Sequence, residues 1–401
     1  MAKSKKNESD KELKKDKKKS DIEIAFENLK GFCQIGARVS SPGNIPTGHF
    51  KLDFAIQYGL DPTKVDLSKV EKNGKRYDPG TTLGIPLGKL VEIYGEEGGG
   101  KSSLSYRILG YAQKLGYLTA WIDAEHSYQE NLAKLNGCDT DNLLYANMVN
   151  HDNTDIVFYA EDVMDNMIKM MRNNVKVIVL DSVAALVPKN QFEAKSEQEF
   201  VGLLPRFLSK NLGKIVAHAE QNGTLLIFIN QLREKIGQMY GDPKTSPGGH
   251  CLHHNASLRL RVDKRNSKDA EIYIPNSETG EDMLIGKHSK VRLIKNRFAQ
   301  PFTESLDIPI YYQSYFPDME NIAFDTGRQI KLISVRKNVF AWGELKIEGR
   351  QQFIDHIKDN NLLEDLMKAI RNKANEDGIL LPPEIIQYSS NAGEIIASEE
   401  E

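Results

Sequence analysis

The chain has 401 residues, of which 40% are hydrophobic and 27% charged, and its formal net charge is -3. This composition is typical of a soluble globular protein with one large domain and smaller ones attached to it. No segment approaches the roughly 18 apolar residues of a membrane span. Three widely spaced cysteines, Cys33, Cys138 and Cys251, do not make a disulfide framework. We therefore expect a cytoplasmic protein with no membrane association.

The two ends of the chain carry opposite charge. Residues 1–20 contain nine lysines, four acidic residues and almost no apolar side chains, which predicts a disordered basic tail. No apolar region follows it, so it is not a secretory signal. The tail either steers the protein toward DNA or only keeps it soluble, and the sequence supports both equally. Residues 374–401 contain seven acidic residues and no basic ones, which predicts a solvated acidic tail.

Between the tails, a helical pattern starts at Ile22, and residues 60–82 have the mixed polar composition of an inserted loop. From Leu90, short apolar runs bounded by Gly or Asp alternate with helical stretches. The predicted strands are 91–95, 118–125, 175–181 and 224–231. Strands that alternate with helices at this spacing indicate a mostly parallel sheet that is covered on both faces.

The pattern changes in the second half of the chain. At 256–263 and 289–295 polar and apolar residues alternate, which predicts antiparallel strands with one solvent-exposed face. Residues 266–288 form a polar excursion between them. After residue 322 a small mixed segment follows, with helical runs at 351–372.

A phosphate-binding loop follows the strand at 91–95 and precedes a helix. It fits the pattern G-x-x-x-x-G-K-[ST], in which backbone N–H groups cradle phosphates. Lys101 is expected to reach the β- and γ-phosphates of a nucleoside triphosphate, and the Ser102 hydroxyl to bind Mg²⁺; the motif does not say which nucleotide. The residues expected to bind the nucleotide are Gly95, Glu96, Glu97, Gly98, Gly99, Gly100, Lys101, Ser102 and Ser103.

Acidic residues end two of the other predicted strands. Asp181 follows the apolar run Val177–Leu180, as expected of a carboxylate that holds Mg²⁺ through water, although such an Asp can also only cap a turn. Asp123 and Glu125 end the strand at 118–125. Glu125 is the better candidate for the base that activates water, and the alternative is a solvated acid at a strand end.

The run from His250 to His254 resembles a zinc-binding cluster at first sight. On an extended strand, however, Cys251 and His253 face one way and the two outer histidines the other, so four ligands cannot converge. We set the zinc interpretation aside.

Several stretches together resemble the bacterial RecA recombinases, over roughly residues 45–310. They are VEIYGEEGGGKSSL, IDAEH, VIVLDSVAALVPK, TLLIFINQLREKIGQMYGDP, SPGGHCL and VRLIKNRFAQPF. The resemblance implies an α/β fold: a P-loop NTPase core of the RecA type with a mostly parallel twisted sheet, an N-terminal helical segment and a small α+β C-terminal domain. It also implies a DNA-dependent ATPase that forms filaments on single-stranded DNA and pairs it with homologous double-stranded DNA in recombinational repair.

The resemblance assigns roles to individual residues. Glu125 matches the family's water-activating Glu, Gln231 its γ-phosphate sensor, and Tyr311 an aromatic residue beside the adenine. Residues 191–202 and 232–247 match the two DNA-binding loops. The residues that match DNA contacts are Val201, Arg206, Arg233, Lys235, Ile236, Met239, Tyr240, Gly248 and Gly249.

Lys295 and Arg297 match two basic residues that enter the ATP site of the neighbouring subunit in a filament. Two cations two residues apart on a strand share one face, so they can act on a γ-phosphate as an arginine finger does. The alternative is a solvated strand edge. The sequence departs from the family at Gln129 and Leu132, near the adenine, and at His253 and His254, near the subunit interface.

The expected organisation has a basic tail, a polymerisation segment, an insert, an ATPase core, a small domain and an acidic tail. Their respective bounds are 1–20, 21–59, 60–82, 83–315, 322–372 and 374–401. The small domain contains cations near Phe340 and Trp342, which favours capture of duplex DNA over a purely structural cap. The alternatives to a recombinase are a hexameric helicase with the same core, or a mediator that does not exchange strands.

Overall fold

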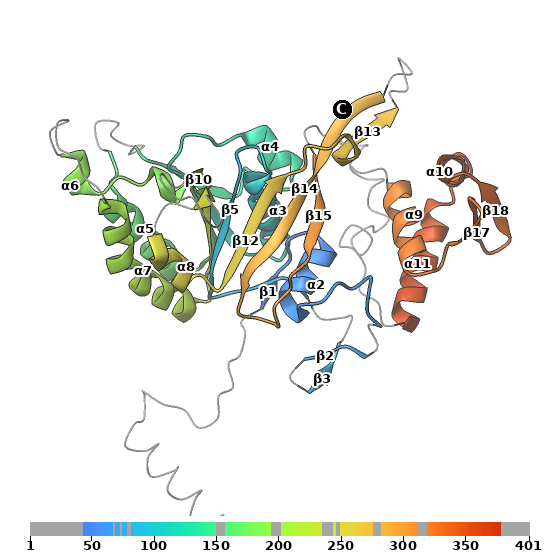
Figure 1. Ribbon diagram of the computed structural model, residues 1–401, viewed down its shortest axis with the longest axis horizontal. Coiled ribbons are helices and arrows are strands. Elements are labelled where there is room, and N and C mark those ends of the chain that lie inside the picture. The colour runs from blue at the N-terminus through green and yellow to red at the C-terminus, as the bar shows by residue number, and fades with distance from the viewer. Residues whose placement is uncertain are drawn as a thin grey trace, which may run out of the picture. The chain divides into compact units, whose positions relative to one another are not determined.

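The computed structural model describes residues 43–66, 69–72, 74–77, 82–149, 157–193, 202–234, 244–245, 249–275, 282–311 and 319–377 (Figure 1). The expected basic tail, the helix starting at Ile22 and all but the first four residues of the acidic tail lie outside these ranges. No helix in the described ranges is both long and apolar enough to span a membrane.

The described residues form a nine-stranded sheet with the order β13-β14-β12-β5-β9-β8-β6-β7, in which β15 also pairs with β14. Its strands are β5 (Leu90–Gly95), β6 (Leu118–Asp123), β7 (Leu143–Asn147), β8 (Val175–Asp181), β9 (Leu225–Gln231), β12 (Leu258–Lys264), β13 (Glu271–Pro275), β14 (Asp282–Asn296) and β15 (Ser305–Tyr311). The strands from β12 to β7 are parallel, and β13, β14 and β15 are antiparallel. The four strands predicted from apolar runs, and the α/β fold, are confirmed.

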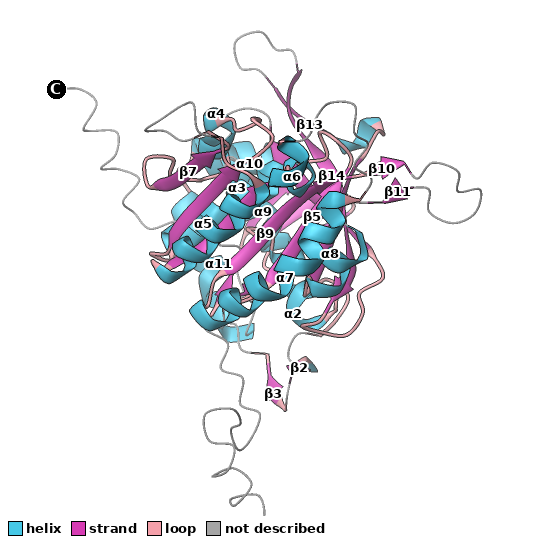
Figure 2. Ribbon diagram, turned by 90° about the vertical axis from the view of Figure 1, so that its left-hand side faces the viewer, coloured by secondary structure: helices cyan, strands magenta, loops and turns pink. Residues whose placement is uncertain are grey.

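Helices cover both faces of this sheet, as Figures 1 and 2 show. Alternate residues of a strand point to opposite faces, so Val177 and Val179 pack with α2 and α3, whereas Ile178 and Leu180 pack with α5 and α7. The helices of this part are α2 (Phe50–Tyr58), α3 (Lys101–Lys114), α4 (Glu130–Leu135), α5 (Ala160–Arg172), α6 (Lys189–Phe192), α7 (Leu203–Asn222) and α8 (Gly249–Asn255).

Among the described residues, three two-stranded sheets lie outside the main sheet. They are β1 (Asn44–Ile45) with β4 (Ile85–Pro86), β2 (Glu71–Lys72) with β3 (Lys75–Arg76), and β10 (Arg233–Glu234) with β11 (Lys244–Thr245). The β2–β3 hairpin lies within the expected insert, where Val70 and Tyr77 are buried against Phe54.

Two details of the antiparallel region differ from the sequence prediction. The segment 266–288 is not an excursion from the sheet, because β13 and the first half of β14 lie in it. Edge strands tolerate such polar sequences, since they pair on one side only. The polar face predicted for 256–263 is also wrong at Arg259, whose residue is only 9% exposed.

The C-terminal part has a core of its own. It contains α9 (Met319–Gln329), β16 (Ser334–Arg336), β17 (Val339–Trp342), β18 (Leu345–Glu348), α10 (Arg350–Asp359) and α11 (Leu363–Asp377). The rings of Phe324, Phe340 and Phe353 meet edge to face or tilted inside it. The helical runs predicted at 351–372 correspond to α10 and α11.

A glycine in α3 lets this helix approach the turn after α4 closely. A Cβ atom on Gly110 would lie 2.2 Å from the carbonyl oxygen of Gly137, a backbone atom. We expect Gly110→Ala to lower the free energy of unfolding by about 1–3 kcal/mol through overpacking. Gly213→Ala in α7 is the matched control, because nothing lies within 4 Å of its added Cβ; it should stabilise by about 0.5–1 kcal/mol. Denaturant unfolding measures both, and equal effects would contradict the prediction.

Candidate active site

The loop between β5 and α3 has a backbone that requires glycine. Gly98 and Gly100 have φ values of 64° and 95°, in the left-handed region that favours glycine. A Cβ atom on Gly99 would lie 2.8 Å from the carbonyl oxygen of Val262 in β12. The loop leads into the N-terminus of α3, which has no side-chain cap. Uncapped N–H groups at a helix N-terminus form a site for phosphate.

Lys101 folds back over this loop. Its Nζ donates hydrogen bonds to the carbonyl oxygens of Gly95 (3.3 Å) and Glu96 (2.8 Å). The residue is only 8% exposed, and burial lowers the pKa of its ammonium group, while Asp181 and Glu125 act in the opposite direction. A buried ammonium group with carbonyl partners can exchange them for phosphate oxygens, which carry full charge.

Ser102 in the first turn of α3 and Asp181 at the end of β8 lie next to each other. Because β5 and β8 are parallel, their carboxyl ends lie at the same edge of the sheet, and the Ser102 hydroxyl donates to Asp181 Oδ2 at 3.1 Å. Burial raises the pKa of Asp181 to about 6. A hydroxyl and a carboxylate oxygen beside a phosphate site suit Mg²⁺, which takes few protein ligands and completes its shell with phosphate and water. The described residues contain no group of three or more His, Cys, Asp or Glu that could hold a metal by itself.

The two acids that end β6 have different surroundings. Asp123 accepts hydrogen bonds from the backbone N–H groups of Ser127 (2.9 Å) and Tyr128 (3.1 Å) and from the Tyr145 hydroxyl (3.1 Å). It therefore shapes the turn after β6. Glu125 is exposed and accepts a hydrogen bond from the side-chain amide of Gln231. Glu125 is thus the acid that faces the candidate γ-phosphate sensor.

Gln231 ends β9 directly beside the phosphate loop, since it is the register partner of Gly95. The next residue, Leu232, donates its N–H to the Gly95 carbonyl at 3.3 Å. Residue 232 also begins the second predicted DNA loop. The structure therefore brings the phosphate loop, Glu125, Gln231 and the start of that loop to one place.

The described residues include only part of the predicted DNA interface. Arg206 is exposed in the first turn of α7, Arg233 lies in β10, and Gly249 begins α8. The predicted contacts outside the described residues are Val201, Lys235, Ile236, Met239, Tyr240 and Gly248.

Tyr311 ends β15 near the phosphate loop. A Cβ atom on Gly100 would lie 2.7 Å from the side chain of Ile310, the residue before Tyr311. This contact brings the end of β15 against the start of α3. Of the two departures from the family near the adenine, Leu132 packs against the apolar core beneath α3, and Gln129 is the N-cap residue of α4.

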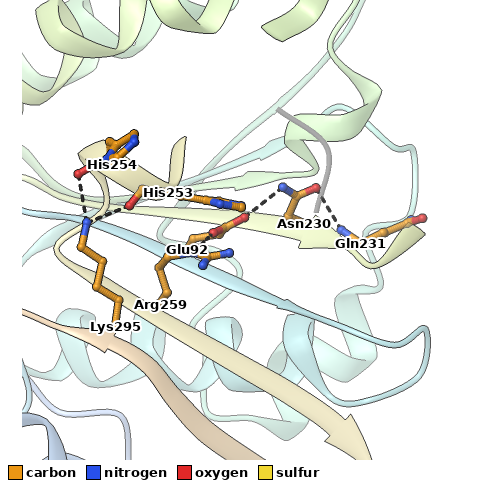
Figure 3. A network of polar contacts seen from close by, with 7 residues as sticks. All are labelled: Glu92, Asn230, Gln231, His253, His254, Arg259 and Lys295. Atoms are coloured by element: carbon orange, nitrogen blue, oxygen red, sulfur yellow. Dashed lines mark hydrogen bonds and ion pairs between the residues drawn. The ribbon is translucent and has the colours of Figure 1, made fainter. Parts of the chain in front are cut away.

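Lys295 points toward the backbone of His253 and His254 (Figure 3), and Arg297 follows it two residues later. Lys295 Nζ donates to the carbonyl oxygens of His253 (2.7 Å) and His254 (2.9 Å), and Arg297 also donates to that of His254 (3.0 Å). Lys295 pairs in register with Arg259, which pairs with Glu92. Gly95 lies three residues further along β5, about 10 Å at the usual rise of a strand.

His253 and His254, whose backbone carbonyls accept hydrogen bonds from these cations, lie on a helix and not on a strand. Residues Gly249–Asn255 form α8, so the strand alternation used above against a zinc site was the wrong argument. Backbone carbonyls at the C-terminus of this helix accept the hydrogen bonds, which is where a helix attracts cations.

Sequence reasoning missed two features of the site. Lys264 ends β12 beside the phosphate loop, and a Cβ atom on Gly98 would lie 3.0 Å from its Nζ. The available signal was a basic residue at the end of a strand paired with β5. The second feature is a buried contact between Glu92, Asn230 and Arg259, for which the signal was a carboxylate inside an apolar strand.

A model of the RecA N-terminal domain matches residues 47–316. The chain belongs to the RecA family. Similar curated proteins, each named protein RecA, come from Porphyromonas gingivalis (32% identical over 372 residues, 89% of this chain and 96% of the relative) and Thermus aquaticus (33% over 338 residues, 83% and 86%). Another is from Caldanaerobacter subterraneus (31% over 333 residues, 82% and 84%). Membership of the RecA family confirms the predicted recombinase of the RecA type, a DNA-dependent ATPase that binds nucleotide.

Proposed function

We propose that this RecA family protein assembles head to tail on single-stranded DNA and exchanges strands with a homologous duplex. Each ATP site is completed by the neighbouring subunit. The observation that carries this proposal is the position of Lys295, about 10 Å along the sheet from its own phosphate loop by strand spacing. Arg297 lies further still, because its backbone N–H donates to the Ser257 carbonyl, and Ser257 is level with Leu90. Lys295 and Arg297 therefore cannot contact phosphates bound to their own chain. In a head-to-tail assembly, each subunit can present these two cations to the phosphate loop of its neighbour.

Within one subunit, the geometry supports the following roles. The N-terminus of α3 and Lys101 hold the triphosphate, and Ser102 and Asp181 hold Mg²⁺, which neutralises phosphate charge. Glu125 accepts the proton of the attacking water. Gln231 contacts Glu125 through its side chain and directly precedes the DNA loop 232–247, a position suited to reporting the γ-phosphate to that loop.

The loops 191–202 and 232–247 grip the phosphate backbone, and the bases stay free to pair. Among the residues whose side chains are described, Arg206 is an exposed cation of this interface. Such binding depends little on sequence and weakens steeply with salt, because each neutralised phosphate releases counterions.

The C-terminal part contributes by charge rather than by stacking. Phe340 is 5% exposed and lies under the Arg328 guanidinium, 5.3 Å from its ring centroid, so this ring belongs to the core. Lys331, Lys337 and Lys346 are exposed. We assign duplex capture to these cations.

Electron microscopy with single-stranded DNA and a slowly hydrolysed ATP analogue tests the assembly. We expect helical filaments, and an ATP hydrolysis rate that rises when single-stranded DNA is added. Closed rings would point to a helicase, and filaments that never exchange strands in a gel assay would point to a mediator. Hydrolysis at full rate by an isolated monomer without DNA would contradict the proposal.

A further inference from the structure

A buried charged cluster lies inside the sheet, behind the candidate sensor Gln231 (Figure 3). Glu92 in the middle of β5 is 0% exposed, Asn230 in β9 is 0% exposed, and Arg259 in β12 is 9% exposed. These three strands are neighbours in the sheet, with β5 in the centre. None of the three residues touches the phosphate loop through a contact described above, so the ATPase chemistry does not account for them.

Each oxygen of the Glu92 carboxylate receives a different donor. Asn230 Nδ2 donates to Oε1 at 3.1 Å, and Arg259 Nε donates to Oε2 at 2.5 Å. The Arg259 guanidinium also lies over the Tyr94 ring, 4.6 Å from its centroid. The Asn230 amide therefore has a defined orientation, with its nitrogen toward Glu92.

This orientation leaves the other end of the same amide facing the sensor. Asn230 Oδ1 accepts the backbone N–H of Gln231 at 3.0 Å. The peptide group between Asn230 and Gln231 is thereby fixed at the last residue of β9, where the chain leaves the sheet and the DNA loop begins. The Gln231 side chain starts from this peptide and reaches Glu125.

Stability does not explain why charges lie here. A buried ion pair is often no more stabilising than an apolar pair of the same volume, because desolvation offsets the attraction. Unlike an apolar side chain, a carboxylate provides Asn230 with a directional hydrogen-bond acceptor.

We propose that Glu92 is a positioning residue that orients Asn230, and through it the sensor Gln231, while Arg259 compensates the buried charge of Glu92. This inference rests on the sensor role given to Gln231 under the proposed function. Loss of the acceptor releases the Asn230 amide, the Gln231 peptide loses its support, and ATP occupancy is no longer transmitted to the DNA loop.

Two double variants of the full chain separate orientation from burial. Glu92→Gln with Arg259→Met removes both charges and keeps an amide oxygen for Asn230. Glu92→Leu with Arg259→Met removes both charges and the acceptor. The readout is the ratio of ATP hydrolysis rates with and without single-stranded DNA, measured together with the unfolding midpoint and binding of a fluorescent ATP analogue.

We expect the Gln variant to retain the DNA stimulation within threefold and the Leu variant to lose it by tenfold or more, with both binding the analogue within twofold of each other. Equal stimulation in the two, or a loss that follows the unfolding midpoint, would overturn the inference.

A single substitution covers the case in which a double variant does not fold. Asn230→Ala removes the link and leaves the ion pair, so it should also lose DNA stimulation by tenfold or more. Asn222→Ala is its control, since the Asn222 amide donates to the His218 carbonyl of its own helix, α7. Retention of stimulation in Asn230→Ala would overturn the inference.

Gln231→Ala shows which idea has failed. If Gln231→Ala keeps full DNA stimulation, the sensor role itself is wrong. If it loses stimulation while Asn230→Ala does not, only the positioning role is wrong.

Discussion

The Lys295→Ala, Arg297→Ala variant is expected to bind ATP but to lose DNA-stimulated hydrolysis by roughly 10³-fold, the effect of removing a finger supplied by a neighbour. Binding persists because Lys101, Ser102 and Asp181 lie in the same chain as the phosphate loop. Phosphate release with and without single-stranded DNA measures the loss, and a fluorescent ATP analogue measures binding. Lys368→Ala, an exposed lysine in α11, is the control and should change neither.

Mixing inactive variants tests whether the site is shared. Lys101→Ala removes the phosphate contact but keeps the cations, and the Lys295→Ala, Arg297→Ala variant does the reverse. In a random equimolar filament about a quarter of the interfaces pair an intact phosphate loop with intact cations, because each interface is head to tail. The mixture should therefore regain part of the lost hydrolysis. A mixture as inactive as its components would mean that Lys295 and Arg297 act within their own subunit.

Glu125→Gln is expected to form filaments on single-stranded DNA and to hydrolyse ATP roughly 10²–10⁴-fold more slowly, the usual contribution of a general base. The amide keeps the size of the carboxylate and can still bond Gln231, but it cannot accept a proton from water. Electron microscopy and phosphate release on the same sample separate assembly from turnover.

Asp123→Asn gives the comparison for Glu125→Gln. Asp123 accepts three hydrogen bonds in the turn after β6, so its loss should lower the unfolding midpoint as well as the rate. If Glu125→Gln hydrolysed ATP normally, the base would have to be another group.

The parallel part of the fold was predictable because its signals are local. Strands such as Val175–Asp181 are continuous apolar runs, and burial on both faces requires that pattern. The phosphate loop could be predicted for the same reason, since its glycines and Lys101 follow one another in the chain. Asp181 could be predicted as a candidate because it directly follows the apolar run Val177–Leu180.

Arg259 shows where local signals fail. A polar residue alternating with apolar ones looks the same whether it faces water or a partner, and here the partner is Glu92, 167 residues earlier in the chain. The helix α8 was not predicted from the sequence for another reason. Its seven residues span two helical turns, too few for a helical period to be recognised. The position of Lys264 beside the phosphate loop could be inferred only once β12 was known to pair with β5.

The separation of the phosphate loop from Lys295 and Arg297 has a consequence for growth. A chain of subunits joined this way has unlike tips: one exposes a nucleotide pocket that no neighbour completes, and the other exposes cations that meet no nucleotide. Under the proposed function, the site at the first tip would lack the cations that speed hydrolysis, so the two tips would gain and lose subunits differently. Such a polymer would have a defined direction of growth.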